Sequence, residues 1–263
     1  MSDTVRYEVE GAVATITMNR PEARNALTAE AKVALLDAVR TAGAADPIRA
    51  VVLTGAGRAF CAGQDLREHA ELLAGGGPAA ALATVRRHYN PIIETIAGMP
   101  KPVVAALPGV AAGAGAGLAF ACDFRVAAER ASLLLAFARV GLGADSGTSW
   151  TLQRLVGSAR ATELLMLAEP VDAPTALALG LVTSVVPAEE LATAAAELAA
   201  RLADGPTLAY AAIRAELRYA AAHGLSEALE KEAELQTRLG ASADHQSATQ
   251  AFLARQAPNY EGR

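Results

Sequence analysis

Hydrophobic and polar residues follow two different periods along the chain. Residues 7–18 alternate with a period of two, which predicts two strands joined as a hairpin. Apolar positions three and four residues apart follow Thr28 and predict a capped helix over residues 29–41. The mostly apolar runs 48–54 and 102–107 predict two buried strands. Strands that alternate with helices in this way are typical of βαβ crossovers and a mostly parallel sheet, so we expect an α/β fold.

The same patterns predict the remaining elements. In chain order they are a short helix capped by Asp65 and ending near residue 73, a flexible glycine loop at 75–78, a helix at 80–98 bent near Pro91, a helix at 115–122, a strand at 124–127, an extended segment at 131–137, helices at 148–156, 159–167 and 173–179, and a strand at 181–186. After Pro187 the pattern is helical, over 191–204, 207–223, 226–239 and 242–254. We therefore expect a core over residues 1–190 and a helical region over 191–263.

Glycine-rich turns follow two of the predicted strands, at residues 55–66 and 109–123. Small side chains let a ligand come close to the backbone, and unpaired N–H groups at a helix start can bind an anion or a polarised oxygen. The second turn lacks the dinucleotide-binding G-x-G-x-x-G order and the P-loop Gly-Lys-Ser/Thr sequence. Ligands of parallel sheets bind at the carboxyl ends of strands, so the two turns are expected to face one crevice. Tight packing without a ligand is the alternative.

Composition and charge exclude several classes of protein. The net charge of −5 and the absence of a Lys/Arg block disfavour nucleic-acid binding. Cys61 and Cys122 make no disulfide framework and the N-terminus has no apolar signal core, so we expect a cytoplasmic protein. Residues 102–122 carry no charge, but Pro102 and Pro108 and a high Ala and Gly content disfavour a membrane span. The four histidines show no metal-ligand spacing, so no metal site is expected.

Five stretches of the chain carry specific motifs. They are Asn19-Arg20-Pro21 with Asn25-Ala26-Leu27, Phe60-Cys61-Ala62-Gly63-Gln64-Asp65-Leu66, the turn 109–123 ending in Cys122-Asp123, Ala178-Leu179-Gly180-Leu181-Val182, and the C-terminal run 252–263. Along nearly its whole length the chain thereby resembles the crotonase, or enoyl-CoA hydratase/isomerase, superfamily. The resemblance implies a ββα spiral core, a helical C-terminal trimerisation region and chemistry on an acyl-CoA thioester. It also implies a homotrimer or dimer of trimers, with coenzyme A entering only as part of the substrate and no other cofactor.

The resemblance assigns site residues around the two turns. The backbone N–H groups of Gln64 and Ala114 would bind the thioester oxygen, which gains negative charge when an enolate forms. Contacts to CoA or substrate would come from Ala23, Arg24, Ala62, Gly63, Asp65, Leu66 and Gly113, and from Phe252 and Arg255 of a neighbouring subunit. The alternatives are that Asp65 is a helix cap, that Arg24 is an ordinary surface arginine, and that the two C-terminal residues have no role at the site.

The reaction depends on which carboxylate transfers the proton. Hydration in the family uses two glutamates, but the corresponding positions hold Gly117 and Phe137, which cannot transfer a proton. The remaining nearby carboxylate is Asp145, in the loop 141–147. That loop resembles the one in 1,2-epoxyphenylacetyl-CoA isomerase and Δ3,Δ2-enoyl-CoA isomerase members of the family. A single base suits isomerisation.

We therefore expect an acyl-CoA isomerase with Asp145 as the acid/base. Burial among Leu142, Trp150 and Phe137 would raise the pKa of its carboxyl group. An aromatic epoxide or an unsaturated fatty acyl-CoA is the expected substrate. The alternatives are that Asp145 caps the following helix, that the protein is a hydratase using unusual groups, and that it is a non-catalytic relative that binds acyl-CoA or RNA.

Overall fold

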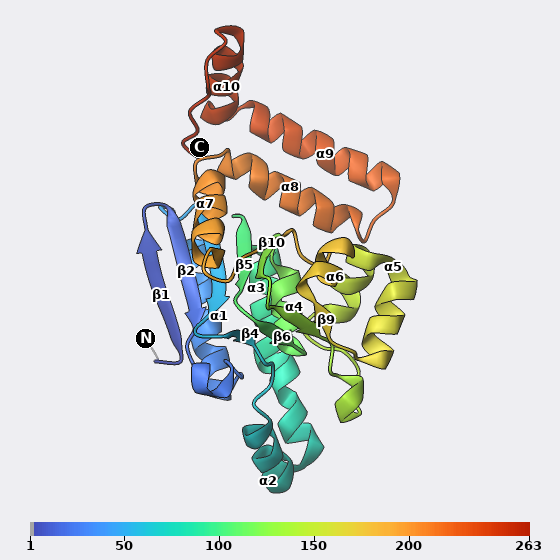
Figure 1. Cartoon of the computed structure of the whole chain (residues 1–263). Helices are drawn as coiled ribbons and strands as arrows, with labels where there is room; N and C mark the ends of the chain where they lie inside the picture. Colours follow the sequence, from blue (N-terminus) through green and yellow to red (C-terminus); the bar gives the residue numbers. More distant parts are fainter. Residues whose placement is uncertain (1–2) are drawn as a thin grey trace.

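The structure, a computed structural model, describes residues 3–263 and contains a six-stranded sheet (Figure 1). The strands lie in the order β1-β2-β3-β5-β7-β10. Their bounds are β1 (Val5–Glu10), β2 (Val13–Met18), β3 (Ala50–Gly55), β5 (Val103–Leu107), β7 (Phe124–Ala128) and β10 (Ser184–Val186). The pair β1–β2 is antiparallel and every other neighbouring pair is parallel, which confirms the predicted hairpin and the predicted parallel sheet.

A second, smaller sheet lies beside the first. Its strands, in the order β4-β6-β8-β9, are β4 (Ala59–Cys61), β6 (Val110–Ala112), β8 (Ser132–Leu134) and β9 (Val171–Asp172). The sequence pattern did not predict β6, which lies inside the second glycine turn. A strand of three residues is too short to display an alternating pattern, so only the pairing with β4 and β8 reveals it.

Ten α-helices surround the sheets within residues 3–263. They are α1 (Ala29–Ala44), α2 (Leu66–Thr84), α3 (Asn90–Gly98), α4 (Ala114–Ala121), α5 (Thr148–Leu167), α6 (Ala173–Ala178), α7 (Leu191–Ala203), α8 (Thr207–Ala220), α9 (Leu225–Gly240) and α10 (Ala243–Leu253). The hydroxyl of Thr28 accepts a hydrogen bond from Ala31 N, as its predicted capping role requires. None of the described helices is long and apolar enough to cross a bilayer, and residues 102–122 are divided among β5, β6 and α4.

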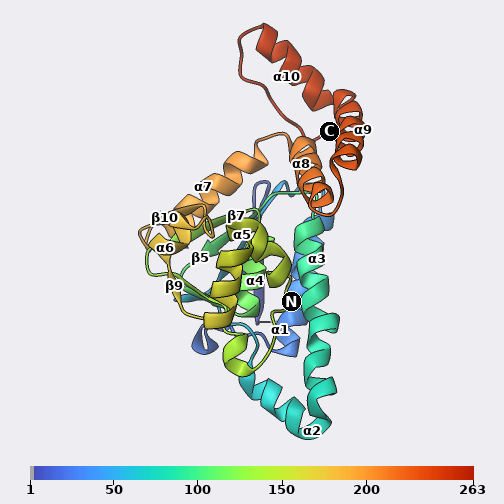
Figure 2. The ribbon, with the colours of Figure 1, turned by 90° about the vertical axis from the view of Figure 1, so that its right-hand side faces the viewer.

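The six-stranded sheet has a buried layer on each face. Val51 and Leu53 of β3 belong to the core that contains α1 and α3, whereas Ala50 and Val52 face the cluster formed with α7. Both faces of β3 are therefore covered, which is why its residues 50–53 are all apolar and do not alternate with polar ones. Figure 2 shows α1 and α3 standing together on one side of the sheet.

Two helices contain a break where the sequence pattern predicts separate segments. The predicted flexible loop 75–78 lies within α2, whose backbone is interrupted only at Gly77, with φ of 71°. Pro78 follows this break, in the first turn of the second half of the helix, where a proline loses no hydrogen bond. In α5, likewise, the predicted helices 148–156 and 159–167 join across Gly157, with φ of 76°. A single glycine in a left-handed conformation thus replaces each predicted connection.

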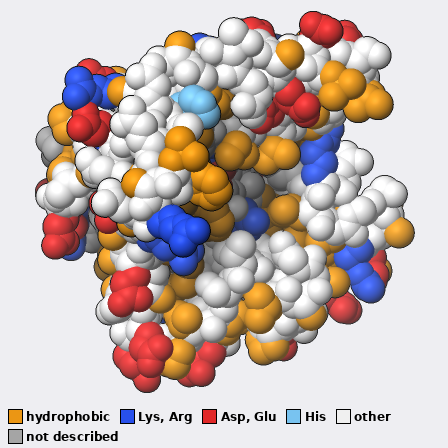
Figure 3. Space-filling model, turned by 90° about the horizontal axis from the view of Figure 1, so that it is seen from above, with side chains coloured by type: hydrophobic (Ala, Val, Ile, Leu, Met, Phe, Trp, Pro, Cys, Tyr) orange, Lys and Arg blue, Asp and Glu red, His pale blue; other side chains and the backbone are white. Residues whose placement is uncertain are grey.

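The last three helices, α8 to α10, extend away from the sheets (Figures 1 and 2). The predicted boundary at 190/191 falls at the start of α7, which still packs on the six-stranded sheet. Exposed apolar side chains are frequent on these helices, and the view of this end from above shows apolar groups at the surface between charged ones (Figure 3). A role of residues 191–263 in oligomerisation stays a prediction.

Arg214 attaches α8 to the core. Its Nε donates to Met99 O over 2.9 Å and its Nη2 to Ile96 O over 2.6 Å, at the end of α3. The same guanidinium forms an ion pair with Asp123, and Asp123 Oδ2 also accepts from Val103 N at the start of β5. The side chain thus joins one of the last three helices to α3 and to the six-stranded sheet.

Replacing Arg214 with alanine is expected to lower the free energy of unfolding by about 2–3 kcal/mol, because Asp123 and two helix-end carbonyl groups lose their charged partner. Urea denaturation followed by circular dichroism measures the change. Arg218→Ala, one turn further along α8 at an exposed position, is the matched control and should cost under about 0.5 kcal/mol. Equal losses in the two variants would contradict the assigned role.

Candidate active site

Seven of the twelve predicted site residues line a cavity of about 500 Å³, whereas Ala23, Arg24, Asp65, Phe252 and Arg255 do not. Its walls come from both glycine turns, from α2, from the segment 136–145 and from Tyr89. The lining residues are Ala62, Gly63, Gln64, Leu66, His69, Leu73, Pro78, Leu82, Thr84, Val85, Tyr89, Ala112, Gly113, Ala114, Ala136, Phe137, Val140, Leu142 and Asp145. Most of these side chains are apolar, and among them Asp145 carries the one carboxylate.

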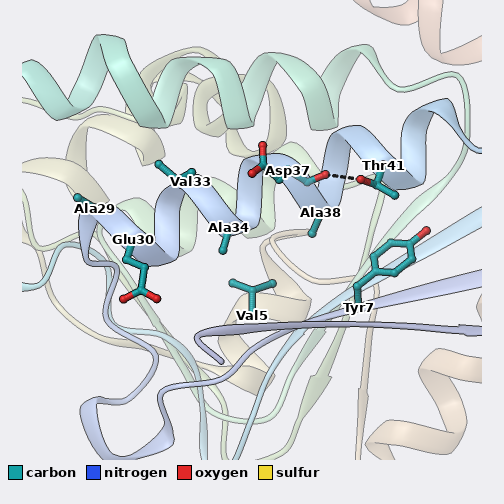
Figure 4. Close-up of a pocket in the computed structure, with 9 residues that line it drawn as sticks. All are labelled: Val5, Tyr7, Ala29, Glu30, Val33, Ala34, Asp37, Ala38 and Thr41. Carbon is teal, nitrogen blue, oxygen red and sulfur yellow. Dashed lines mark hydrogen bonds between the residues drawn. The ribbon is translucent and has the colours of Figure 1, made fainter. Parts of the chain in front are cut away.

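Another hollow, of about 490 Å³, lies between β1 and α1 (Figure 4). Val5 and Tyr7 of the strand face Ala34 and Ala38 of the helix across it. None of the predicted site residues lines this hollow. We therefore place the candidate active site in the cavity beside the glycine turns.

The two glycine turns touch one another through their backbones. β4 and β6 pair in parallel, so the turns that follow them leave the sheet at the same edge. A Cβ atom on Gly63 would lie 2.7 Å from Ala112 O and 3.4 Å from Ala114 N. Gly63 also has φ of 85°, a conformation that side chains other than glycine rarely adopt. Only glycine allows this approach, which brings residues 63–64 next to Ala114.

Gln64 and Ala114, the residues whose backbone N–H groups are the predicted oxyanion donors, both line the cavity. Ala114 is the first residue of α4, where an N–H has no partner within the helix. Leu27 bonds to the residues on either side of Gln64, since Leu27 N donates to Gly63 O over 2.7 Å and Asp65 N donates to Leu27 O over 3.1 Å. Gln64 lies between these two bonds, and in a parallel bridge the N–H of the residue in that position points away from the partner, here Leu27. Neither N–H donates a hydrogen bond to any residue from 3 to 263.

The polar loop that precedes α1 lies directly beside the first turn. Ala62 N donates to Arg24 O over 3.0 Å, so the predicted CoA contacts Ala23 and Arg24 adjoin Ala62 and Leu66. The carboxylate of Asp65 is already engaged. It forms an ion pair with Arg20 at 2.9 Å, and it caps α2 by accepting from the N–H groups of its first turn. The backbone of Asp65 is engaged as well, since its N–H donates to Leu27 O and its oxygen accepts from His69 N.

Phe252 and Arg255 do not join the cavity. They lie in and just after α10, at the opposite end of the molecule from α2 in Figure 1, and the side chain of Phe252 is 82% exposed. Within this chain they are too remote to touch a ligand in the cavity. Their contact with the CoA of a neighbouring subunit stays a prediction.

Asp145 lines the cavity with its carboxylate facing Ser146, whose Oγ donates to Asp145 Oδ1 over 2.8 Å. Burial raises the pKa of the Asp145 carboxyl group, while the Ser146 hydrogen bond and the charge of Lys32 act in the opposite direction. The carboxylate does not cap α5, because the cap residue is Gly147 and Thr148 N donates to the backbone oxygen of Asp145.

The predicted surroundings of Asp145 are partly wrong. Phe137 and Leu142 line the cavity with it, as expected. Trp150 does not line it: its side chain is 43% exposed and packs under the Arg154 guanidinium, 4.0 Å from the ring centre. The side chain leaves α5 toward solvent, so the ring cannot bury the carboxylate.

The positions that carry glutamates in family hydratases are occupied differently here. A Cβ atom on Gly117 would lie 2.6 Å from Ser146 Cβ and 2.8 Å from Ser146 O, so no side chain fits on this turn of α4. Phe137 is 7% exposed and contributes an apolar wall. The absence of a side chain at Gly117 is what lets the segment carrying Asp145 pack directly on α4.

The sequence pattern of the enoyl-CoA hydratase/isomerase family matches residues 8–263. The chain belongs to the enoyl-CoA hydratase/isomerase family. It is 42% identical to a protein of Rhodobacter capsulatus named as a probable enoyl-CoA hydratase, covering 99% of this chain and 98% of that one. It is 39% identical to the 1,2-epoxyphenylacetyl-CoA isomerase of Escherichia coli, with full coverage of both (100% and 100%).

The fold is also that of the family. The crystal structure of an enoyl-CoA hydratase from Polaromonas sp. JS666 superimposes with a TM-score of 0.92 at 35% identity, covering 98% of this chain and 99% of that one. The expected crotonase fold, a spiral core followed by C-terminal helices, is thereby confirmed. The relatives carry both hydratase and isomerase names, so membership of the family leaves the reaction to be decided by the residues of the cavity.

Sequence reasoning missed four polar residues of the candidate site: His69, Thr84 and Tyr89 line the cavity, and Lys32 lies behind its wall. Lys32 is 1% exposed, and its Nζ donates to Gln64 Oε1 over 2.9 Å and to Thr84 Oγ1 over 2.7 Å. Tyr89 Oη donates to the same Gln64 oxygen over 2.7 Å. The available signal was Lys32 itself, a lysine on the apolar stripe that Leu35 and Val39 continue in α1. No group of three or more potential metal ligands occurs among residues 3–263.

Gly117→Ala is expected to push the segment around Ser146 off α4 and so to displace Asp145. Because a shift of about 1 Å in a reacting group can cost about 100-fold, turnover of enoyl-CoA should fall by at least about 10-fold. Steady-state kinetics and a crystal structure of the variant measure the two effects.

The matched control is Gly143→Ala in the same loop, where an added Cβ meets no atom within 4 Å. This control should turn over substrate at close to the wild-type rate. Full activity in Gly117→Ala would show that the contact between α4 and the loop is unimportant.

Proposed function

We propose that the protein is an acyl-CoA isomerase in which Asp145 moves a proton beside a thioester enolate. The observation that carries the proposal is the composition of the cavity wall. Asp145 lies there together with the Gln64 and Ala114 turns, while Gly117 and Phe137 stand where a family hydratase has its two glutamates. One carboxylate can return to carbon the proton that it has removed, whereas activating a water and protonating carbon together call for a second group.

In the proposed reaction the thioester oxygen accepts hydrogen bonds from Gln64 N–H and Ala114 N–H. The Asp145 carboxylate removes the C2 proton of a 3-enoyl-CoA, and the resulting negative charge is delocalised onto the thioester oxygen. The same carboxyl group then returns the proton to C4, which leaves the double bond between C2 and C3. Ser146 donates to Oδ1 of Asp145, so Oδ2 is the atom that takes the proton. Two fixed donors aimed at the developing charge supply the electrostatic stabilisation.

The proposed substrate carries an apolar acyl group. Leu73, Leu82, Val85, Phe137 and Val140 contribute apolar surface to the cavity wall, and such surface favours a hydrocarbon chain or ring over a charged group. The E. coli relative is named for an epoxide of phenylacetyl-CoA, which supports an aromatic acyl group as the narrower choice. An unsaturated fatty acyl-CoA is the broader one.

We also propose the setting in which the enzyme works. Coenzyme A enters only as part of the substrate, without a further cofactor. The chain forms a homotrimer or a dimer of trimers, in which Phe252 and Arg255 approach the CoA of a neighbour. Apolar side chains exposed on α8 to α10 support such an assembly. The proposed location is the cytoplasm.

Incubation with 3-enoyl-CoA and 2-enoyl-CoA in deuterated water tests the reaction. The wild type should interconvert the two with little hydration. Asp145→Asn should lower kcat by about 100- to 10,000-fold, since it removes the acid/base. Asp172→Asn, which alters an aspartate that caps α6 outside the cavity, is the matched control and should keep kcat.

Two other outcomes identify the rival functions. Strong hydration that survives Asp145→Asn would establish a hydratase and overturn the proposal. Tight binding of CoA esters without turnover by the wild type would establish a binding protein.

The pH dependence of kcat/KM should show an acid limb that reports the protonation of Asp145. The group must be ionised to act as a base, and burial raises its pKa, so the acid limb should lie above the ordinary aspartate value of about 3.9. Activity should be full above this limb and fall as pH decreases through it. Ser146→Ala removes a hydrogen bond that lowers the pKa and should move the limb to higher pH. If Ser146→Ala leaves the acid limb at the same pH, the limb does not report the ionisation of Asp145.

A further inference from the structure

A buried lysine lies behind the first glycine turn. Lys32 is 1% exposed, and removal of an ammonium group from water is costly unless fixed partners compensate it. Its partners are Gln64 and Thr84, through hydrogen bonds of 2.9 and 2.7 Å, and the ring of Tyr89, with Nζ 5.1 Å from the ring centre. All three partners line the cavity. The groups that compensate the buried ammonium group are thus also groups of the candidate active site.

The chemistry of the groups fixes the direction of each hydrogen bond. An ammonium group can only donate, so Gln64 Oε1 and Thr84 Oγ1 both accept from Lys32. The Tyr89 hydroxyl donates to the same Gln64 oxygen over 2.7 Å. The proton of Thr84 is then available for Nδ1 of His88, 3.0 Å away. The carboxamide oxygen of Gln64 therefore accepts from two donors that are far apart in sequence. Lys32 belongs to α1, and Tyr89 belongs to the helical turn Val85–Tyr89.

The backbone of Gln64 is held from one side, by Leu27, which bonds to Gly63 O and to Asp65 N. Its place in secondary structure is a single isolated bridge with Leu27, between β4 and α2. Nevertheless its N–H is one of the two proposed donors to the thioester oxygen, and such donors act only if they are held in place before the reaction. The side chain is a second means of fixing this residue, in addition to the bridge with Leu27 and the approach of Gly63 to the second turn.

We propose that Lys32 is a positioning residue, which holds the Gln64 side chain and thereby aims the Gln64 N–H at the thioester oxygen. The inference rests on the proposed function, since it assigns Lys32 to the oxyanion hole that the isomerase requires. Lys32 itself touches no reacting atom. Its removal loosens one donor and leaves both Ala114 and Asp145 in place.

Cinnamoyl-CoA allows the hydrogen bonds of the oxyanion hole to be measured without proton transfer. Its double bond is conjugated with the thioester, and its C4 carries no hydrogen, so Asp145 cannot isomerise it. N–H donors that polarise the thioester carbonyl move the absorbance of the bound acyl group to longer wavelength. The size of this shift therefore reports the donors even if no catalysis occurs.

The experiment compares the full-length wild type with Lys32→Met and Gln64→Met, which remove the same contact from its two sides. Both variants should show a smaller red shift of cinnamoyl-CoA and a kcat for 3-enoyl-CoA lowered by about 10- to 100-fold. KM should change much less than kcat, because the lost interaction is stronger in the transition state than in the bound substrate. The double variant should be no worse than either single one, as expected for residues that act through one contact.

Lys101→Met is the matched control. Lys101 is also buried, 7% exposed, but it donates to Ala42 O and Ala45 O at the end of α1, outside the cavity. This variant should lose thermal stability and keep both the red shift and kcat. Equal effects of Lys32→Met and Lys101→Met on the shift and on kcat would overturn the proposal.

The remaining outcomes are also decisive. A folded Lys32→Met protein with the full red shift and normal kcat overturns the proposal. If that variant does not fold, Gln64→Met decides by the same shift. If the wild type shifts the spectrum but does not isomerise 3-enoyl-CoA, the proposed function fails, whereas the role of Lys32 is still decided by the shift in its variants.

Discussion

The site depends on one contact, the approach of the backbone at Gly63 to the backbone between Ala112 and Ala114. Parallel pairing of β4 and β6 brings the two turns together, and the missing side chain at Gly63 lets them touch. The two N–H groups are consequently placed by strand pairing and by a helix start. Dipoles held in this way need no reorganisation when charge develops on a bound oxygen.

The proposed choice of Asp145 as the proton-transferring group rests on a second close contact, between Gly117 and Ser146. Gly117 lacks the side chain that a family hydratase uses, and the space it leaves is filled by Ser146. In this chain the missing side chain at position 117 and the position of the segment that carries Asp145 are therefore linked. A glutamate at position 117 and an aspartate at position 145 cannot both be accommodated with this packing of the loop on α4. If the protein is the proposed isomerase, steric exclusion at Gly117 sets its reaction type as much as the identity of the acid/base does.

Sequence alone predicted those parts of the site that are adjacent in the chain. Each of these features, the two glycine turns and the helix start at Thr28, is encoded by residues that are neighbours in the chain, and their predicted positions agree with the structure. Lys32 and Tyr89 were missed because they lie far from Gln64 in sequence and meet it only when α1 packs against the turn before α3. The outward direction of Trp150 likewise depends on how α5 packs. The roles of the predicted site residues stay predictions, since position in a cavity is not yet function.

The break at Gly77 has a consequence for the range of acyl groups that the cavity admits. Leu73 precedes the break and Pro78 and Leu82 follow it, yet all three line the cavity. The distance across the cavity therefore depends on the angle between the two halves of α2, in addition to the volumes of the side chains. Substrate size is in this sense a property of backbone curvature, so that relatives with identical wall residues can differ in the chain length or ring size they accept.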